Sequence, residues 1–120
     1  MPASLPIDAL LPGLTEFLHA GVSCVIDAPP GSGKTTRVPL ALMDAPWLGG
    51  RKILMLEPRR LAARSAARHM AGLLREKTGG RIGYRTRLDT RVSKETRVEV
   101  VTEGVLTRML LHDPELSGYG

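Results

Sequence analysis

The chain has 120 residues, a net charge of +5, and a composition that is 42% hydrophobic and 24% charged. These values exclude a disordered chain, and no apolar run approaches the ~20 residues that cross a bilayer, so we expect no membrane partner. The single cysteine, Cys24, excludes a disulfide framework; we expect it to be buried, in a protein of the reducing cytoplasm. The positive charge favours a polyanionic partner, and the aromatic content of 3% favours contacts to a phosphate backbone over base stacking.

Apolar runs and amphipathic stretches alternate along the chain, which predicts an α/β fold with a mostly parallel sheet and helices on both faces. We expect helices over residues 5–19, 33–44, 59–77 and 105–112, and strands over residues 22–27, 52–57, 82–88 and 97–101. The run at 22–27 is nearly continuous, which is typical of a strand covered on both faces. Residues 89–96 are polar and predict a connection.

The ends of these elements carry local signals. Leu10, Leu14, Phe17 and Leu18 form the apolar stripe of the first helix, and Gly21 can end it. Pro39 predicts an irregularity or an early end in the second helix. Thr102 is the natural cap of the last helix.

The expected helix over 59–77 has a basic face. Arg60, Arg64, Arg68 and Arg75 fall within roughly an 80° arc, opposite the side that holds Ala63, Ala66 and Met70. Two interpretations stay open, a solvated face and a face that meets nucleic acid or nucleotide.

The strongest functional signal is a glycine-rich turn between the first expected strand and the second helix. The stretch from Ala28 to Thr36, Ala-Pro-Pro-Gly-Ser-Gly-Lys-Thr-Thr, has the layout of a phosphate-binding P-loop, with Ala28 where the general pattern opens with Gly. Glycines let several backbone N–H groups point into one concavity at a helix N-terminus. Lys34 would place its charge on the β- and γ-phosphates of ATP, and the Thr35 hydroxyl would bind Mg²⁺. We therefore expect ATP and Mg²⁺ as cofactors, Lys34 and Thr35 as catalytic residues, and nucleotide contacts from Pro30, Gly31, Ser32, Gly33, Lys34, Thr35 and Thr36.

A P-loop hydrolase also needs a carboxylate at the end of a second apolar strand, to position Mg²⁺ and the attacking water. Asp27 ends an apolar run, but this run leads directly into the P-loop. Asp113 follows another, whose spacing is helical. Neither fits, so we expect the sequence to be the N-terminal piece of a longer protein and to be inactive as a hydrolase by itself.

Three blocks after the P-loop resemble motifs of one enzyme family. Leu-Glu-Pro-Arg-Arg-Leu-Ala-Ala from Leu56 to Ala63 resembles motif Ia of superfamily 2 DEAH-box helicases. Gly-Tyr-Arg-Thr-Arg from Gly83 to Arg87 resembles the strand that follows it, and Thr-Glu-Gly-Val-Leu from Thr102 to Leu106 resembles motif Ib. Within the family, the P-loop together with Leu-Glu-Pro-Arg-Arg is most similar to the bacterial HrpB-type helicases. The ordered blocks cover about residues 5–118.

This resemblance implies the N-terminal part of a RecA-like ATP-binding domain, spanning residues 1–120 and truncated before the DEAH motif. The whole protein would use ATP to move along a single strand of nucleic acid and to unwind duplexes, with RNA favoured over DNA as the substrate and the remaining helicase domains in cis. In that family motifs Ia and Ib contact the sugar-phosphate backbone, and an arginine after motif Ia stacks on the adenine. Transferred by position, the strand contacts are Arg59, Arg60, Thr102, Glu103 and Gly104, and the adenine contact is Arg68.

Two other functions remain open. A non-catalytic nucleotide- or RNA-binding P-loop module accounts for the missing carboxylate strand. A P-loop small-molecule kinase accounts for the loop but leaves Arg59-Arg60 and the Thr-Glu-Gly block unexplained.

Overall fold

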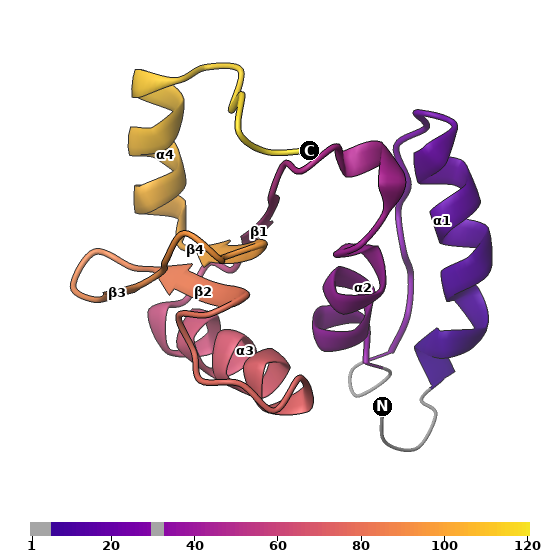
Figure 1. Ribbon diagram of the computed structural model, residues 1–120, viewed down its shortest axis with the longest axis horizontal. Coiled ribbons are helices and arrows are strands. Elements are labelled where there is room, and N and C mark those ends of the chain that lie inside the picture. Colours follow the sequence, from indigo (N-terminus) through magenta and orange to yellow (C-terminus); the bar gives the residue numbers. More distant parts are fainter. Residues whose placement is uncertain (1–5, 30–32) are drawn as a thin grey trace.

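The structure is a computed structural model that describes residues 6–29 and 33–120 (Figure 1). Three of the expected P-loop residues, Pro30, Gly31 and Ser32, lie outside the described residues. In chain order the helices and strands are the 3-10 helix η1 (Pro6–Leu10), α1 (Leu11–His19), α2 (Lys34–Leu42), the 3-10 helix η2 (Pro46–Leu48), β1 (Ile53–Leu56), α3 (Arg60–Leu73), β2 (Ile82–Arg85), β3 (Thr90–Arg91), β4 (Val98–Val101) and α4 (Glu103–His112).

The four strands form one sheet in the order β1-β4-β2-β3. The central strand β4 runs parallel to β1 on one side and to β2 on the other, whereas β3 is antiparallel to β2. Leu56 and Arg85, the last residues of β1 and β2, both pair with Val101, the last residue of β4. The three parallel strands therefore end level, and the residues that follow them meet at one edge of the sheet. The mostly parallel sheet is as predicted.

The core lies between α3 and one face of the sheet. The α3 residues Ala63, Ala67 and Met70 are fully buried, as are Ile82, Val98 and Val100 on the strands, and all six belong to one apolar cluster. Alanine side chains on α3 let the helix approach the sheet closely. The helix α4 lies on the opposite side of the sheet from α3 (Figure 1), so helices flank both faces, as expected.

The expected strand over residues 22–27 is not formed. The segment is extended but pairs with none of the described strands, and it runs between α1 and α2 rather than within the sheet (Figure 1). Its side chains are exposed, with Val25 at 98%, except that Ile26 is half-buried, and Cys24 is exposed rather than buried. An apolar run becomes a strand only where a neighbouring strand supplies its hydrogen bonds, and the described residues place no strand beside this one.

The expected helix over 59–77 ends at Leu73 because a Schellman motif closes it. The Glu76 N–H donates to the Ala71 carbonyl at 2.9 Å, the Arg75 N–H donates to the Gly72 carbonyl at 3.0 Å, and Arg75 takes a positive φ of 58°. Arg75 therefore lies beyond the helix, and the arginine stripe on α3 consists of three residues rather than four. The same motif ends α1, where Gly21 supplies the positive φ of 81°, as predicted.

Other boundaries differ by a few residues. The first helix begins with the 3-10 turn η1, and of its expected apolar stripe Leu14 is buried while Leu10 and Phe17 are more than half exposed. Pro39 lies inside α2, which ends at Leu42 instead of residue 44. Residues 89–96, expected as a connection, contain β3, so β2 stops at Arg85 and turns into a hairpin. Pairing with β2, rather than any apolar pattern, makes β3 a strand.

Candidate functional site

The described part of the phosphate loop is the start of α2. Gly33 has a φ of 98°, which favours glycine, and its carbonyl accepts the first helical bonds from Thr36 and Arg37 at 3.2 and 2.7 Å. The Lys34 ammonium donates to the Ala28 carbonyl at 2.9 Å, so its Nζ lies over the beginning of the loop. Lys34 and Thr35 are exposed and Thr36 is half-buried.

These residues fit the triphosphate of a nucleotide. The first N–H groups of a helix have no intrahelical partner and carry the positive end of its dipole, which favours an anion. A phosphate oxygen is a stronger acceptor for an ammonium group than a neutral carbonyl, so a nucleotide would draw Lys34 away from Ala28. Within residues 6–29 and 33–120, no three His, Cys, Asp or Glu side chains are grouped to hold a metal ion.

A second site forms where the parallel strands end. A cavity of about 530 Å³ is lined by residues that come from three places in the sequence: Pro58, Arg59, Arg60, Leu61, Ala62, Arg87 and Thr102. We call it the strand-end cavity. Arg59, Arg60 and Thr102 were predicted from two separate motifs, and the structure brings them together because β1 and β4 are neighbours in register. The bond from the Glu57 N–H to the Val101 carbonyl, at 2.9 Å, continues this pairing to the rim of the cavity.

Arg87 lies in the strand-end cavity, although it was not among the residues predicted to contact a strand. It sits in the tight turn between β2 and β3, which the Thr86 N–H closes by donating to the Asp89 carbonyl at 2.8 Å. The Tyr84 hydroxyl donates to the Asp89 carboxylate at 2.6 Å, and Arg64 of α3 faces the same carboxylate at 3.7 Å. The turn is therefore fixed to α3. Arg87 belongs to the Gly-Tyr block, and this block was the sequence signal that could have pointed to it. Its place in the strand-end cavity, however, depends on β2 lying next to β4.

The first residues of α4 complete the rim. Thr102 precedes α4 in an extended conformation and its carbonyl accepts from Leu106 at 3.0 Å, but its hydroxyl makes no capping bond. The hydroxyl thus remains available to a ligand. Glu103 and Gly104 are exposed but do not line the cavity. The Glu103 carboxylate would repel a phosphate, so a contact from these two residues would use backbone N–H groups.

The arginines of α3 have separate surroundings. Arg60 lines the strand-end cavity, Arg64 is paired with Asp89, and Arg68 is exposed. Arg68 is absent from the lining of the strand-end cavity, which is consistent with an assignment other than strand binding.

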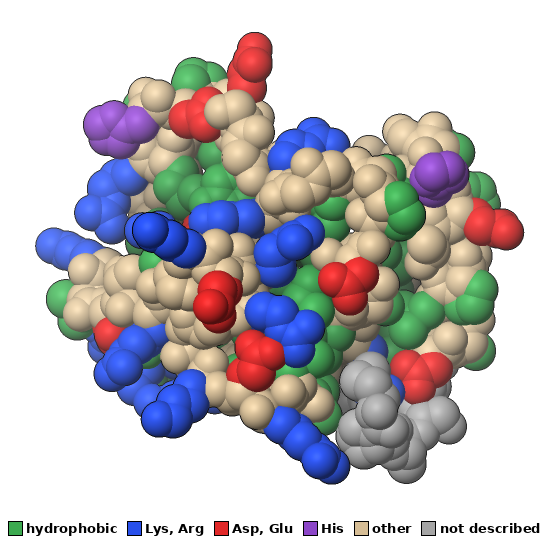
Figure 2. Space-filling view, in the orientation of Figure 1, with side chains coloured by type: hydrophobic (Ala, Val, Ile, Leu, Met, Phe, Trp, Pro, Cys, Tyr) green, Lys and Arg blue, Asp and Glu red, His purple; other side chains and the backbone are tan. Residues whose placement is uncertain are grey.

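Basic side chains are concentrated on one part of the molecule. All 17 Lys and Arg residues lie at or after Lys34 in the sequence. In Figure 2 they gather over the sheet and α3, whereas the side of α1 shows neutral side chains together with acidic ones. This distribution places positive potential around the strand-end cavity.

Comparison with known proteins gives relatives that extend well beyond this chain. Over 118 residues, or 98% of the chain, the sequence is 52% identical to the ATP-dependent RNA helicase HrpB of Escherichia coli (strain K12), and the chain spans 14% of that protein. It is 37% identical over 117 residues to the pre-mRNA-splicing factor ATP-dependent RNA helicase DEAH10 of Arabidopsis thaliana, spanning 16% of it. No protein-family model matches the chain.

Solved structures give the same result for the fold. A crystal structure of the Escherichia coli DEAH/RHA helicase HrpB superposes with a TM-score of 0.91 at 52% identity, over 98% of this chain and 15% of that one. A crystal structure of the E. coli DExH-box NTPase HrpB gives 0.92 at 51% identity, over 100% of this chain and 15% of that one. The α/β fold of a partial RecA-like domain is confirmed. Separately, none of the helices in the described part of the chain is long and apolar enough to cross a membrane.

Proposed function

We propose that this chain, which belongs over nearly its whole length to the DEAH family of helicases, binds ATP at the start of α2 and one strand of RNA at the strand-end cavity. It would be the N-terminal part of a RecA-like ATP-binding domain that stops before the DEAH motif. The longer protein would couple ATP hydrolysis in the cytoplasm to movement along RNA, with its other helicase domains in cis. The chain alone would not hydrolyse ATP.

The observation that carries this proposal is the composition of the strand-end cavity. Arg59 and Arg60 follow β1, Arg87 follows β2 and Thr102 follows β4, so three separate segments contribute to one surface. Three guanidinium groups and a hydroxyl are groups that bind phosphate oxygens without reading bases. The lining contains no Phe, Tyr or Trp, so base stacking has no platform there. The names of the relatives support RNA as the nucleic acid.

At the nucleotide site, Lys34 would bind the β- and γ-phosphates and Thr35 would bind Mg²⁺. The backbone of Gly33 and Thr36, with Pro30, Gly31 and Ser32 outside the described residues, would surround the phosphates. Arg68 would stack on the adenine. Mg²⁺ would neutralise phosphate charge, while the chain itself supplies the ammonium group of Lys34 and the N–H groups of α2.

Two substitutions test the two sites independently. Lys34→Ala should abolish ATP binding in a fluorescent-nucleotide titration and leave RNA affinity unchanged, because its exposed ammonium group bonds to the Ala28 carbonyl and does not line the strand-end cavity. Arg59→Ala should weaken RNA binding equally for all sequences and lower the salt dependence, while ATP affinity stays the same. Unchanged ATP affinity in the first variant, or a loss confined to one RNA sequence in the second, would contradict the assignments. In a longer chain that continues past Gly120, single-stranded RNA should stimulate ATP hydrolysis.

A further inference from the structure

A cavity of about 540 Å³ lies next to the strand-end cavity, between the β2–β3 hairpin and α4. We call it the α4 groove. Arg85, Thr86 and Thr90 form one wall, and the α4 face with Val105, Arg108, Met109 and His112 forms the other. The four α4 residues follow the i, i+3, i+4, i+7 spacing that puts side chains on one side of a helix. Val105 is buried, whereas Arg108 and His112 are exposed.

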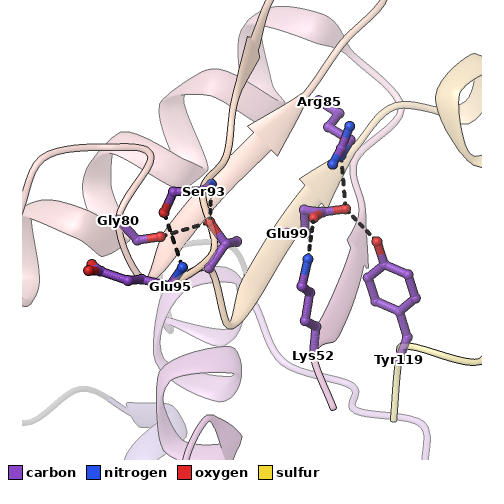
Figure 3. Close-up of polar contacts among 8 residues, drawn as sticks. Lys52, Gly80, Arg85, Ser93, Glu95, Glu99 and Tyr119 are labelled. Atoms are coloured by element: carbon purple, nitrogen blue, oxygen red, sulfur yellow. Dashed lines mark hydrogen bonds and ion pairs between the residues drawn. The ribbon is translucent and has the colours of Figure 1, made fainter. Parts of the chain in front are cut away.

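Arg85 and Tyr119, which line the groove, belong to a charged cluster centred on Glu99, which does not itself line it. Glu99 on β4 is fully buried, and its carboxylate lies 3.3 Å from the Lys52 ammonium, 3.2 Å from the Arg85 guanidinium and 2.7 Å from the donating Tyr119 hydroxyl (Figure 3). One carboxylate faces two cations, so the cluster keeps one net positive charge. Lys52 and Arg85 side chains remain 33% and 40% exposed. Glu99 therefore orients Arg85 without cancelling the positive charge at this place.

One acidic residue, Asp113, lines the groove, and its carboxylate is hydrogen-bonded to a neutral neighbour, which orients it but leaves its charge in place. Both the N–H and the hydroxyl of Ser117 donate to the Asp113 carboxylate at 2.9 Å. Arg85 on one wall thus faces Arg108 on the other wall. Cations on both sides of a groove concentrate positive potential within it.

The α4 groove is continuous with the strand-end cavity along the chain. Thr86 lines the groove and the next residue, Arg87, lines the cavity. On the other wall, Thr102 lines the cavity and Val105, one helical turn further along, lines the groove. A strand that crosses the ends of β1, β4 and β2 would thus have the groove as its next contact.

We propose that the α4 groove is a second phosphate-binding site, in which Arg108, Arg85 and His112 hold the part of a single RNA strand that extends past the strand-end cavity. This rests on the proposed function, because the strand must first be bound at Arg59, Arg60 and Arg87. The groove extends the bound length of RNA rather than reading its sequence. Arg108 is the contact to test, because it is exposed, whereas Arg85 is held by the buried Glu99.

The experiment measures binding of fluorescein-labelled oligouridylates of ~4 and ~12 nucleotides, lengths that bracket common single-strand site sizes. Arg108→Ala should leave the affinity for the short RNA unchanged and lower that for the long RNA about fivefold, the loss expected for one exposed ionic contact. The slope of log affinity against log salt should fall by about 0.7 for the long RNA only. Lys94→Ala is the matched control, since Lys94 is an exposed cation that lines neither cavity, and it should change neither affinity.

The outcomes separate this proposal from the proposed function. If Arg59→Ala weakens both RNAs while Arg108→Ala matches the unsubstituted chain for both, the groove proposal is overturned and RNA binding at the strand-end cavity stands. An equal loss for both lengths in Arg108→Ala also overturns it, because Arg108 would then act on the cavity itself. If neither variant changes RNA binding, the proposed function fails. Polyglutamate binding that depends on Arg108, without any dependence of RNA binding, would show the groove to be a protein-docking surface.

Discussion

Replacing Gly104 by Ala separates a role in folding from a contact with RNA, because the two roles predict opposite effects. Gly104 is the second residue of α4 and is exposed, and a Cβ built on it meets no atom within 4 Å. Its φ is not among the positive values in the described chain. The fold therefore places no demand for glycine at this position, and a backbone contact with a ligand is a reason for it.

The expected change in stability follows from helix propensity. Alanine is favoured over glycine within a helix by about 0.5–1 kcal/mol. With an unfolding entropy of ~2.1 cal/mol/K per residue, this gain raises the Tm of a 120-residue chain by about 2–4 °C. If a phosphate approaches the backbone at Gly104, the added methyl group displaces it. The loss of one charge-assisted hydrogen bond then lowers RNA affinity about tenfold.

The assay combines a thermal melt followed by circular dichroism with fluorescence anisotropy on the short oligouridylate. Gly72→Ala is the matched control, since Gly72 lies in α3, is exposed, and also has no atom within 4 Å of a built Cβ. Both variants should have a raised Tm, and only Gly104→Ala should lose RNA affinity. A raised Tm with unchanged RNA affinity in Gly104→Ala would refute the backbone contact. A lowered Tm would show that the space around Gly104 is not open.

Three further predictions concern the hairpin and the residues after α4. Gly83→Ala should lower the free energy of unfolding by about 1–3 kcal/mol in urea titrations, because the new Cβ would lie 2.5 Å from the Arg91 carbonyl oxygen; an unchanged urea midpoint would contradict this close approach. Burial, and then the Glu99 carboxylate, raise the pKa of the Tyr119 hydroxyl, so the stability that this group contributes is present below pH ~10 and is lost as the pH rises further. Tyr119→Phe should therefore weaken the decline of the urea midpoint at alkaline pH. An identical decline in the variant would contradict this role of Tyr119. The hydrogen bond from Tyr84 lowers the pKa of Asp89, so the stability that this carboxylate contributes is present above pH ~4 and is lost as the pH falls through the lowered pKa of the folded state. Asp89→Asn should therefore flatten the fall of the urea midpoint at acid pH. An unchanged slope at acid pH would refute the role of this carboxylate.

Helix ends show how far local sequence can be interpreted. Both α1 and α3 end in a Schellman motif, and both need a residue with positive φ. At α1 this residue is Gly21, which pays little for that conformation, so the end was predictable. At α3 it is Arg75, which has a φ of 58°. Arginine has no preference for positive φ, so the sequence did not indicate the end of the helix, and the predicted helix ran four residues too far.

Strand prediction failed for a different reason. Residues 22–27 and the strand β1 have the same kind of apolar run, yet β1 pairs with β4 and the earlier segment pairs with none of the described strands. An apolar pattern indicates that a segment can be buried, but the partner that buries it is chosen by the rest of the chain. The converse holds for β3, which is polar and becomes a strand through its bonds to β2.

The residues of the candidate site also fall into those that local sequence indicates and those that depend on the sheet. Lys34, Arg59 and Thr102 lie in compact motifs that can be interpreted locally, and the structure places Arg59 and Thr102 in one cavity. Arg87 could not be assigned from its neighbours, because its place depends on β2 lying beside β4, with the strands ending level. Strand order and register are properties of the whole sheet. They add Arg87, whose own motif did not assign it to the site.

Both proposed ligands, ATP and RNA, carry several phosphates, and the same local arrangement recurs at each proposed binding site. An extended segment precedes a helix at each place: residues 22–29 come before α2, β1 before α3, and β4 before α4. Helix N-termini favour anions through their unpaired N–H groups, and each is accompanied here by a side chain suited to phosphate, Lys34, Arg60 or Thr102. Because β1 and β4 are parallel neighbours, α3 and α4 begin at the same edge of the sheet. This common edge is why two sequence motifs more than 40 residues apart would grip one strand.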